Sequence, residues 1–423
     1  MLILFLSNVY MFKTLWKKLT QTQALEQTSG KFEMYFFETV YRLAYIEGIS
    51  TAEHSALYFA YCNTVKLLLI MFCAAELWFF LSNIHSIEGA IDSVNIIFIQ
   101  TGALCKYVNW VRNQSIFKTL ASSMESPHFD LSTPDRQNIL LTWVNRNRHS
   151  LQLLISLGMG TLIAWYGYPL LDEHEYNLPV AIILPFAFDS PKIYFVTYTT
   201  VVVVFSYISF FVMVNDLIMQ SYLMHLLCQF DVLNNCFQNI LVDCSAKFKD
   251  IPFNELYKNL IFQRVYIKRL GDLVEQHKLI LDNTTKLRNM LSKPMIVQLG
   301  VSTTLLCSIG YQAVMSLHVN ITKSIMGLLY LGYNMFVLFT ICRWCEEVKT
   351  QSELTRDAIY SSGWECGLSG VAGVRSRLLV ALLRGSRPVV MSAGGMYDLS
   401  LAAFSTMVKT SYSALTLLLR LQR

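Results

Sequence analysis

The sequence predicts an all-α membrane protein with seven transmembrane helices, a cytosolic amino terminus and an extracellular carboxyl terminus. Hydrophobic residues make up 54% of the 423 residues and charged residues only 15%, whereas a soluble protein carries about 25% charged residues. The apolar residues form long runs, and the basic residues gather between particular runs. This composition disfavours a soluble enzyme, and the net charge of +5 does not indicate a nucleic-acid partner.

Seven apolar runs approach the length of about 20 residues that a helix needs to cross a bilayer. Four of them, residues 150–171, 193–215, 294–317 and 324–342, contain no Asp, Glu, Lys or Arg. The other three, residues 55–82, 90–110 and 399–419, contain charged side chains. We expect Glu76, Asp92 and Lys106 to reach the membrane interface from near the run ends, and interpret the deeper Lys66 and Lys409 as functional positions.

The basic residues between the runs orient the predicted bundle. Twenty-two Lys and Arg residues lie in the segments 111–149, 216–293 and 343–398, but only Lys192 and Lys323 lie in the loops on the opposite side. Short cytosolic loops carry an excess of Lys and Arg, so the three basic segments are expected in the cytosol. The amino terminus is then cytosolic, which is the reverse of the orientation of G-protein-coupled receptors.

The chain divides into six segments. The amino-terminal segment is expected in the cytosol, and two groups of spans follow it, separated by a cytosolic helical extension. A cytosolic anchor then precedes the last span. Within this anchor, residues 367–383 are expected to form a cytosolic or interfacial helix. The boundaries, in that order, are 1–54, 55–228, 229–293, 294–344, 345–397 and 398–423.

Three local signals concern processing and chemistry. The apolar first twelve residues lack a basic region and a small-residue cleavage site, so we expect no cleaved signal peptide, with Met11 as an alternative start. Asn320 is the one glycosylation sequon expected in an outer loop. We interpret Cys342 and Cys345 as packing residues. The eight histidines are scattered and no paired carboxylates lie in the spans, so we expect no catalytic site, metal or cofactor.

The carboxyl-terminal stretch LSLAAFSTMVKTSYSALTLLLRLQR resembles the last helix of insect odorant receptors. That family's pattern matches Ser400, Phe404, Lys409 and the run Ser411-Tyr412-Ser413. The segments AIYSSGW (358–364) and RPVVMSAGG (387–395) support the resemblance. Insect gustatory receptors usually end in a Thr-Tyr-hydrophobic-Gln-Phe pattern, which is absent here, and the odorant co-receptor lacks the Lys-x-Ser-Tyr-Ser pattern.

The resemblance implies a ligand-tuning subunit of an odorant-gated, non-selective cation channel. Such a subunit assembles with the odorant co-receptor in a heterotetramer, in the plasma membrane of olfactory sensory neurons. The family places the pore along the last helix, and the pocket for a small volatile odorant in the outer half of the second, third, fourth and sixth spans. The alternatives are a gustatory-type homotetrameric channel and, from another class, a metabotropic receptor or a transporter.

A pocket for volatile molecules should be apolar and aromatic with few polar groups. Gly158, Thr161 and Trp165 share one helical face in the third span, and Tyr330 and Tyr333 are one turn apart in the sixth. These residues, together with Asn95, Phe98, Tyr198, Val202 and Phe205, are the expected ligand contacts. The Tyr and Trp side chains favour aromatic or heterocyclic ligands.

A ring of bulky apolar side chains can close a pore by dewetting. Leu415 and Leu419 form an i, i+4 row on the last predicted helix. Aligning Tyr412 with the family's tyrosine implies that Leu415 is the gate and that Leu419 lies one turn outward. Lys409 lies further inward, where its charge would tune the conduction of cations or contact a neighbouring subunit.

Overall fold

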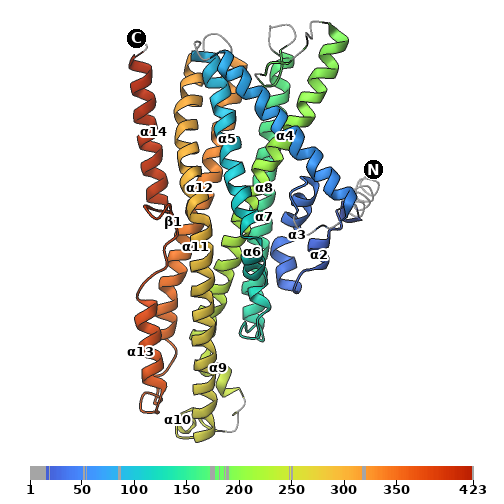
Figure 1. Ribbon diagram of the computed structural model, residues 1–423. Helices are drawn as coiled ribbons and strands as arrows, with labels where there is room; N and C mark the ends of the chain where they lie inside the picture. Colours follow the sequence, from blue (N-terminus) through green and yellow to red (C-terminus); the bar gives the residue numbers. More distant parts are fainter. Residues whose placement is uncertain are drawn as a thin grey trace, which may run out of the picture.

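The computed structural model shows an elongated bundle of long helices (Figure 1). The residues that it describes are 16–18, 20–50, 53, 55–83, 87–171, 177–180, 182–184, 186, 190–246, 248, 251–316 and 321–421. The expectations about the first twelve residues and about Asn320 lie outside these residues.

Four helices run through most of the length of the bundle. They are α7 (Pro134–Leu171), α8 (Pro191–Gln238), α11 (Leu260–Ser316) and α12 (Ile321–Tyr360). Each joins an apolar run to a charged extension, as expected for residues 229–293 and beyond residue 344. At the start of α8, Pro191 occupies the first helical position and the Ser190 side chain accepts a hydrogen bond from the Ile193 amide, which is a typical helix start.

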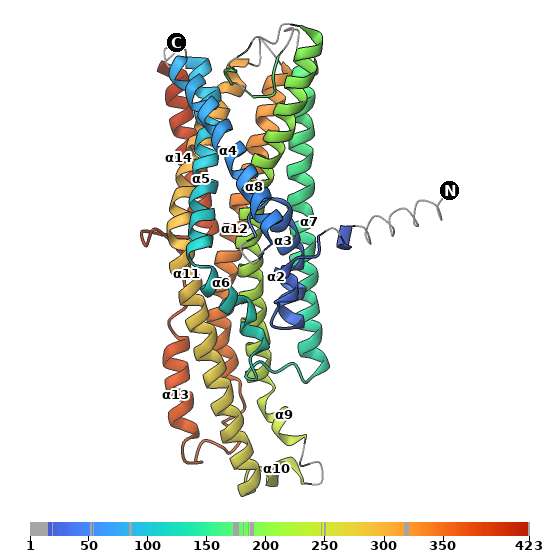
Figure 2. The ribbon, with the colours of Figure 1, turned by 45° about the vertical axis from the view of Figure 1, so that its right-hand side comes forward.

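Three further helices lie beside one half of these four. They are α4 (Ala56–Ser82), α5 (Ile87–Arg112) and α14 (Leu401–Leu421), and both α5 and α14 pack against α11 (Figures 1 and 2). Among the described residues, α4, α7, α8, α11 and α12 are long and apolar enough to cross a membrane. The count of seven spans and the direction of the termini remain predictions.

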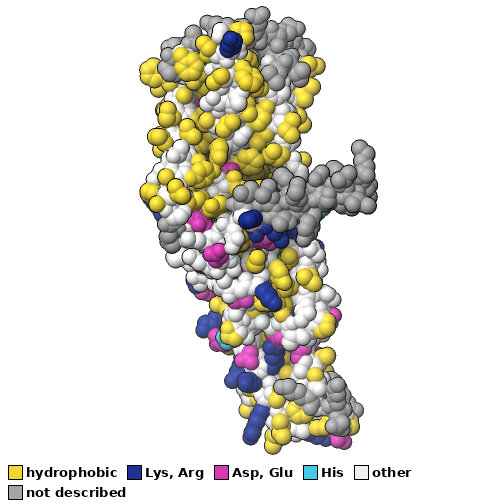
Figure 3. All heavy atoms as spheres, turned by 90° about the vertical axis from the view of Figure 1, so that its right-hand side faces the viewer, with side chains coloured by type: hydrophobic (Ala, Val, Ile, Leu, Met, Phe, Trp, Pro, Cys, Tyr) yellow, Lys and Arg dark blue, Asp and Glu magenta, His cyan; other side chains and the backbone are white. Residues whose placement is uncertain are grey.

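The bundle has two halves of different surface character. The half that contains α4, α5, α14 and residues 150–171, 191–215, 294–316 and 321–342 is called the apolar half here. The other half, residues 114–149, 216–293 and 343–398, is called the charged half. Figure 3 shows hydrophobic side chains over the first and most of the Lys, Arg, Asp and Glu side chains over the second.

Short elements complete the charged half and the middle of the bundle. The segment before the first long helix forms α2 (Gln23–Glu26) and α3 (Lys31–Ile46), and α3 packs against α8. Four more short helices, α6 (Gln114–Ala121), the 3-10 helix η1 (Ser122–Glu125), α9 (Ile240–Ser245) and α10 (Phe253–Leu256), connect the long ones.

The anchor segment differs in part from the expectation. The predicted helix over residues 367–383 is wrong at its start, because α13 spans Val374–Gly385. Gly363, Gly367 and Gly373 have φ angles of 70°, 112° and 87°, which a right-handed helix does not accommodate. Strands β1 (Ser392–Ala393) and β2 (Tyr397–Asp398) then form a short antiparallel hairpin that leads into α14.

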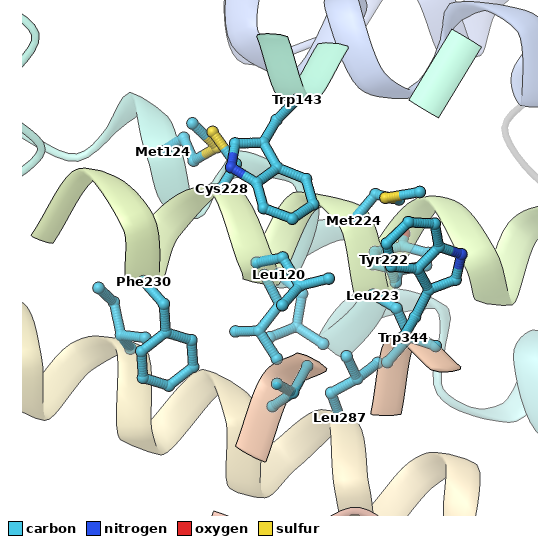
Figure 4. Packing of buried hydrophobic residues seen from close by; sticks show 14 of the residues in the cluster. Leu120, Met124, Trp143, Tyr222, Leu223, Met224, Cys228, Phe230, Leu287 and Trp344 are labelled. Atoms are coloured by element: carbon cyan, nitrogen blue, oxygen red, sulfur yellow. The ribbon is translucent and has the colours of Figure 1, made fainter. Parts of the chain in front are cut away.

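The main hydrophobic core lies in the charged half (Figure 4). Leu223, Cys228 and Phe230 of α8 are completely buried, and α7 and α12 face them with Trp143 and Trp344, whose ring centroids are 6.4 Å apart. Cys342 and Cys345 are buried in the same core at 0% and 1% exposure. This half therefore encloses its own core within one chain.

Candidate ligand cavity and the carboxyl-terminal helix

A cavity lies in the apolar half between α5, α7, α8 and α12. It is partly open, and the space inside it together with its opening amounts to about 710 Å³. Most of its wall is apolar or aromatic. The lining residues are Ile96, Ile99, Gln100, Gly158, Thr161, Leu162, Trp165, Phe205, Ile208, Ser209, Val212, Met213, Tyr330, Tyr333 and Asn334.

An aromatic cluster forms one wall of the cavity. The ring of Trp165 meets Tyr330 edge-on, with the centroids 5.2 Å apart at 75°, and lies 5.8 Å from the ring of Phe205. The Trp165 indole N–H donates a hydrogen bond of 2.6 Å to the Pro179 carbonyl oxygen. The indole is therefore held in place by a contact outside the cavity, and its only donor is already used.

Gly158 makes room for two side chains of this wall. A Cβ atom at this position would lie 3.1 Å from the sulfur of Met213 and 3.4 Å from the hydroxyl oxygen of Tyr333. A larger residue would therefore displace the neighbours that α8 and α12 contribute to the cavity. The glycine lets α7 approach both helices closely.

Polar groups on the wall are few, and several are already hydrogen-bonded. The single hydrogen of the Thr161 hydroxyl is shared between two carbonyl oxygens of its own helix, those of Leu157 and Gly158, both at 2.8 Å. The Asn334 amide nitrogen donates to the Tyr330 carbonyl oxygen at 2.9 Å. A ligand would thus meet a largely apolar surface with a small number of polar contacts.

The structure brings six of the ten expected ligand contacts together around this cavity. They are Gly158, Thr161, Trp165, Phe205, Tyr330 and Tyr333.

The other four expected contacts lie elsewhere. Asn95 accepts a hydrogen bond from Ser308 of α11, and Phe98 is 41% exposed on the outside of α5. The Tyr198 hydroxyl donates to the Tyr166 carbonyl oxygen, and Val202 lies outside the cavity lining.

The sequence reasoning missed the faces of α5 and α8 that line the cavity. On α5 the lining positions are Ile96, Ile99 and Gln100, which adjoin Asn95 and Phe98 but lie on another face of the helix. On α8 the lining continues from Phe205 through Ile208, Ser209, Val212 and Met213. Following the i+3 and i+4 spacing from Phe205 toward the charged half would have found these α8 residues.

One acidic and one basic side chain of the apolar helices, Glu76 and Lys106, are buried rather than directed to the membrane interface. The expectation that Glu76 and Lys106 reach the membrane interface is wrong, because they are 1% and 4% exposed. The Lys106 Nζ lies 2.5 Å from the Asp216 Oδ1, one helical turn below the cavity residue Val212. Burial of the cation is balanced by this carboxylate, which lies 110 positions away in the sequence. Lys66, by contrast, is exposed on α4.

The carboxyl-terminal helix contacts α11 through the face that bears the predicted gate. A Cβ atom at Gly310 would lie 2.9 Å from Leu415 Cδ2, and the buried Ser411 accepts a hydrogen bond from the Cys307 thiol through its carbonyl oxygen. Leu419, one turn beyond Leu415, is half-buried. In the single chain this row therefore faces α11.

The opposite face of α14 is open. Tyr412 is 64% exposed, and Lys409 is also exposed. At the start of the helix, the Leu401 amide donates to a Glu346 carboxylate oxygen at 2.9 Å. A carboxylate at a helix amino terminus stabilises it, so α12 fixes the point at which α14 begins.

Comparison with known proteins identifies related sequences. The 7tm Odorant receptor family model matches residues 86–412. Odorant receptor 33c of Drosophila melanogaster is 32% identical over 156 residues, which cover 36% of this chain and 39% of that relative. Odorant receptor 2a of the same fly is 28% identical over 168 residues, covering 39% and 40%. The match to these fly receptors thus spans less than half of their length. Odorant receptor 10 of Aedes albopictus is 21% identical over 317 residues, covering 73% and 78%.

Solved structures share the fold. The structure of the insect olfactory receptor OR5 from Machilis hrabei in complex with eugenol matches with a TM-score of 0.75 at 15% identity, covering 92% of this chain and 100% of that chain. The structure of the same receptor reported without eugenol matches with a TM-score of 0.73. At this level of identity the likeness establishes the helical architecture alone.

Proposed function

Since the chain belongs to the insect odorant receptor family, we propose that it binds small volatile molecules in the cavity between α5, α7, α8 and α12 and thereby opens a cation channel. The observation that carries this proposal is the cavity itself. Its aromatic and aliphatic wall suits ligands that offer much apolar surface and little hydrogen bonding.

The conducting unit is a heterotetramer of this chain and the odorant co-receptor, in the plasma membrane of olfactory sensory neurons. α14 supplies the pore wall. Its open face, which includes Lys409 and Tyr412, is free to meet other subunits or the pore, while Leu415 and Leu419 form the gate after a rotation away from α11. Cations are the permeant species.

The cavity and α14 are connected through packed helices. α5 lines the cavity and packs against α11, which in turn packs against α14. A ligand that changes the position of α5 would alter the surface of α11 on which Leu415 rests. This route offers a physical link between ligand binding and the pore helix, and the link requires that the ligand bind one arrangement more tightly than the other.

Coexpression with the co-receptor tests the function. We expect volatile-evoked cation current from cells that express both chains, little current from this chain alone, and no such response from the co-receptor alone. Robust current from this chain alone would favour the homotetrameric alternative. The absence of any volatile-evoked current, with the complex present at the cell surface, would contradict the proposed function.

Substitution in the cavity tests the site. Trp165→Ala and Tyr330→Ala should each shift the odorant concentration for half-maximal current by about tenfold or more, because each removes a large part of the aromatic wall. Phe195→Ala on the exposed outer face of α8 is the matched control and should leave this concentration unchanged. Unchanged potency and efficacy of every active odorant in both cavity variants would exclude this cavity as the site.

A further inference from the structure

One polar side chain of the cavity, Gln100, is held from behind by two residues of α4. Its amide nitrogen donates to the Glu76 Oε2 at 2.7 Å, and its carbonyl oxygen accepts from the Cys73 thiol at 2.8 Å. Cys73 and Glu76 are three residues apart and therefore lie on the same face of α4. Neither of them lines the cavity, and both are linked to it by their hydrogen bonds to Gln100.

The Glu76 carboxyl group has few partners. It is 1% exposed, and its second oxygen has no hydrogen-bond partner among the described residues. None of the ion pairs found in the described part of the chain includes it. A carboxyl group in an apolar helix bundle is costly, and such groups are retained mostly where they serve a function. Within the described part of the chain, its one hydrogen bond is to Gln100.

These two hydrogen bonds fix the orientation of the Gln100 carboxamide. Both ends of the carboxamide are engaged, and the orientation found gives each donor an acceptor. One amide hydrogen and one carbonyl lone pair remain, because a carboxamide has two donors and two acceptor positions. The hydroxyl of Thr161 and the N–H of Trp165 already donate to backbone carbonyls. Gln100 is thus a fixed polar group on a wall that is otherwise apolar along α5.

We propose that Gln100 determines which chemical class of volatile this chain prefers: a small molecule with a carbonyl or hydroxyl oxygen, over a hydrocarbon of the same shape. Glu76 and Cys73 are positioning residues that hold the Gln100 carboxamide for this contact. This inference rests on the proposed function, because it concerns the ligand of the same cavity.

Matched pairs of volatiles test the preference. Acetophenone and α-methylstyrene differ by a carbonyl oxygen in place of a methylene group, and benzyl alcohol and ethylbenzene differ by a hydroxyl in place of a methyl group. In the wild-type complex with the co-receptor, the polar member should act at about five- to tenfold lower concentration, which is the effect of one hydrogen bond. Gln100→Met keeps the length of the side chain and should reduce this ratio to about one. Ile96→Val, in the same wall, should affect both members of a pair equally.

The positioning role needs a different comparison. Glu76→Gln retains a hydrogen-bonding partner for Gln100 and should keep most of the preference, whereas Glu76→Met should lower the ratio toward that of Gln100→Met. A merely structural role of Glu76 would change both members of each pair equally, and would leave the ratio intact in both variants. Cys73→Ala should reduce the ratio less than Glu76→Met, because a thiol is a weak donor.

Ligand binding and evoked current are measured separately, so that a failure of the proposed channel function can be told from a failure of the inference about Gln100. The same pairs are titrated against the purified complex, with ligand-dependent thermal stabilisation as the readout. Preferential binding of the polar members without any evoked current would contradict the channel function and retain the role of Gln100. Equal preference in wild type and Gln100→Met, or no preference in the wild type, would overturn the inference about Gln100.

Discussion

The two halves of α8 pack in different ways although they belong to one continuous helix. In the charged half, nearly every residue from Asp216 to Phe237 is buried within the chain. From Pro191 to Val212, in the apolar half, the buried residues are Thr197, Val201, Phe205, Ile208 and Phe211, which recur at about one helical turn and mark a single face. The first region is thus a closed core, and the second leaves three sides of the helix for neighbours, lipid or a cavity.

This difference in packing indicates that the two halves of the bundle have different roles. A closely packed core has few alternative arrangements, because side chains fill its volume at high density. The apolar half encloses a cavity and exposes large side chains such as Phe195 and Val196, so fewer contacts fix its helices. We therefore attribute the stability of the chain mainly to the charged half, and ligand binding with its conformational response to the apolar half.

Truncating one phenylalanine in each half of α8 gives the largest expected difference. Phe230→Ala should destabilise the chain by about 3–5 kcal/mol, because Phe230 is completely buried in the main core. Phe205→Ala should cost less stability than Phe230→Ala, because one side of Phe205 faces the cavity rather than packed side chains, and it should instead change odorant potency. The thermal midpoint of the purified complex and the dose–response curve check the two effects. Equal losses of stability would contradict the comparison.

The ion pairs of the two halves should respond differently to substitution. In the charged half, Arg136 is completely buried, donates to Asp130 at 2.7 Å and also pairs with Asp243, which Arg269 contacts from the other side. Although burial opposes it, hydrogen bonds from Ser132 and the charges of Arg269 and Arg136 lower the pKa of Asp130.

Removal of Arg136 leaves Asp130 and Asp243 with Arg269 as their ion-pair partner among the described residues. Arg136→Ala should destabilise the chain by about 3 kcal/mol. At the junction of the halves, replacing both Lys106 and Asp216 by Met and Leu should be nearly neutral for stability, because a buried pair can be exchanged for apolar contacts. Thermal unfolding of both variants provides the measurement. A loss from the double variant as large as that from Arg136→Ala would show that the Lys106–Asp216 pair is a main stabilising contact.

The contact between α11 and α14 offers a smaller and more specific effect. Gly310→Ala would press a methyl group against Leu415, whose flexible end can move. We expect little change in stability, below about 1 kcal/mol, but a shift in basal current, because the substitution biases the position of the predicted gate. Gly300→Ala on the same helix, with no side chain or backbone of another element within 4 Å of the added atom, is the control. Identical basal currents in the two variants would argue against a gating role for Leu415.

His277, in the charged half, should add a pH-dependent contribution to stability that is smaller than the losses expected from Phe230→Ala and Arg136→Ala. Burial, with the charge of Arg384, lowers the pKa of His277 to about 4, below the unfolded value of about 6.5. Protonation therefore favours the unfolded chain, so the contribution of His277 is complete above about pH 6.5 and is lost as the pH falls toward 4. Between pH 7.5 and 5.5 the loss should be about 1 kcal/mol. His277→Gln should reduce the change in thermal midpoint over this interval, and an unaltered change would contradict the assignment.

Much of the helical layout could be predicted from the sequence, whereas the rotation of helices in the apolar half could not. Length and composition locate a helix, and in the charged half the alternation of apolar and charged residues also indicates its buried face. In a span surrounded by lipid, the outward face is apolar too, so the pattern does not tell Asn95 and Phe98 from Ile96, Ile99 and Gln100.

Side-chain contacts between residues distant in the sequence could not be predicted either. Lys106 and Asp216 are 110 residues apart, and nothing in the local pattern of either indicates the other. Glu76 and Gln100 lie on neighbouring helices at positions that depend on how α4 and α5 are rotated. The prediction that Glu76 and Lys106 reach the membrane interface was wrong because each has a buried polar partner in place of water: Gln100 for Glu76 and Asp216 for Lys106.

The central claim, that odorants act by occupying the cavity of the apolar half, is tested most directly by protection of an introduced cysteine. Ser209→Cys places a thiol in the cavity wall, and Thr199→Cys places one on the exposed surface of the same helix. A small methanethiosulfonate reagent should alter the odorant-evoked current of the Ser209→Cys channel relative to wild type. A saturating dose of the most potent odorant should slow this modification severalfold and leave modification of Thr199→Cys unaffected. Modification of Ser209→Cys at the same rate with and without odorant would contradict the account.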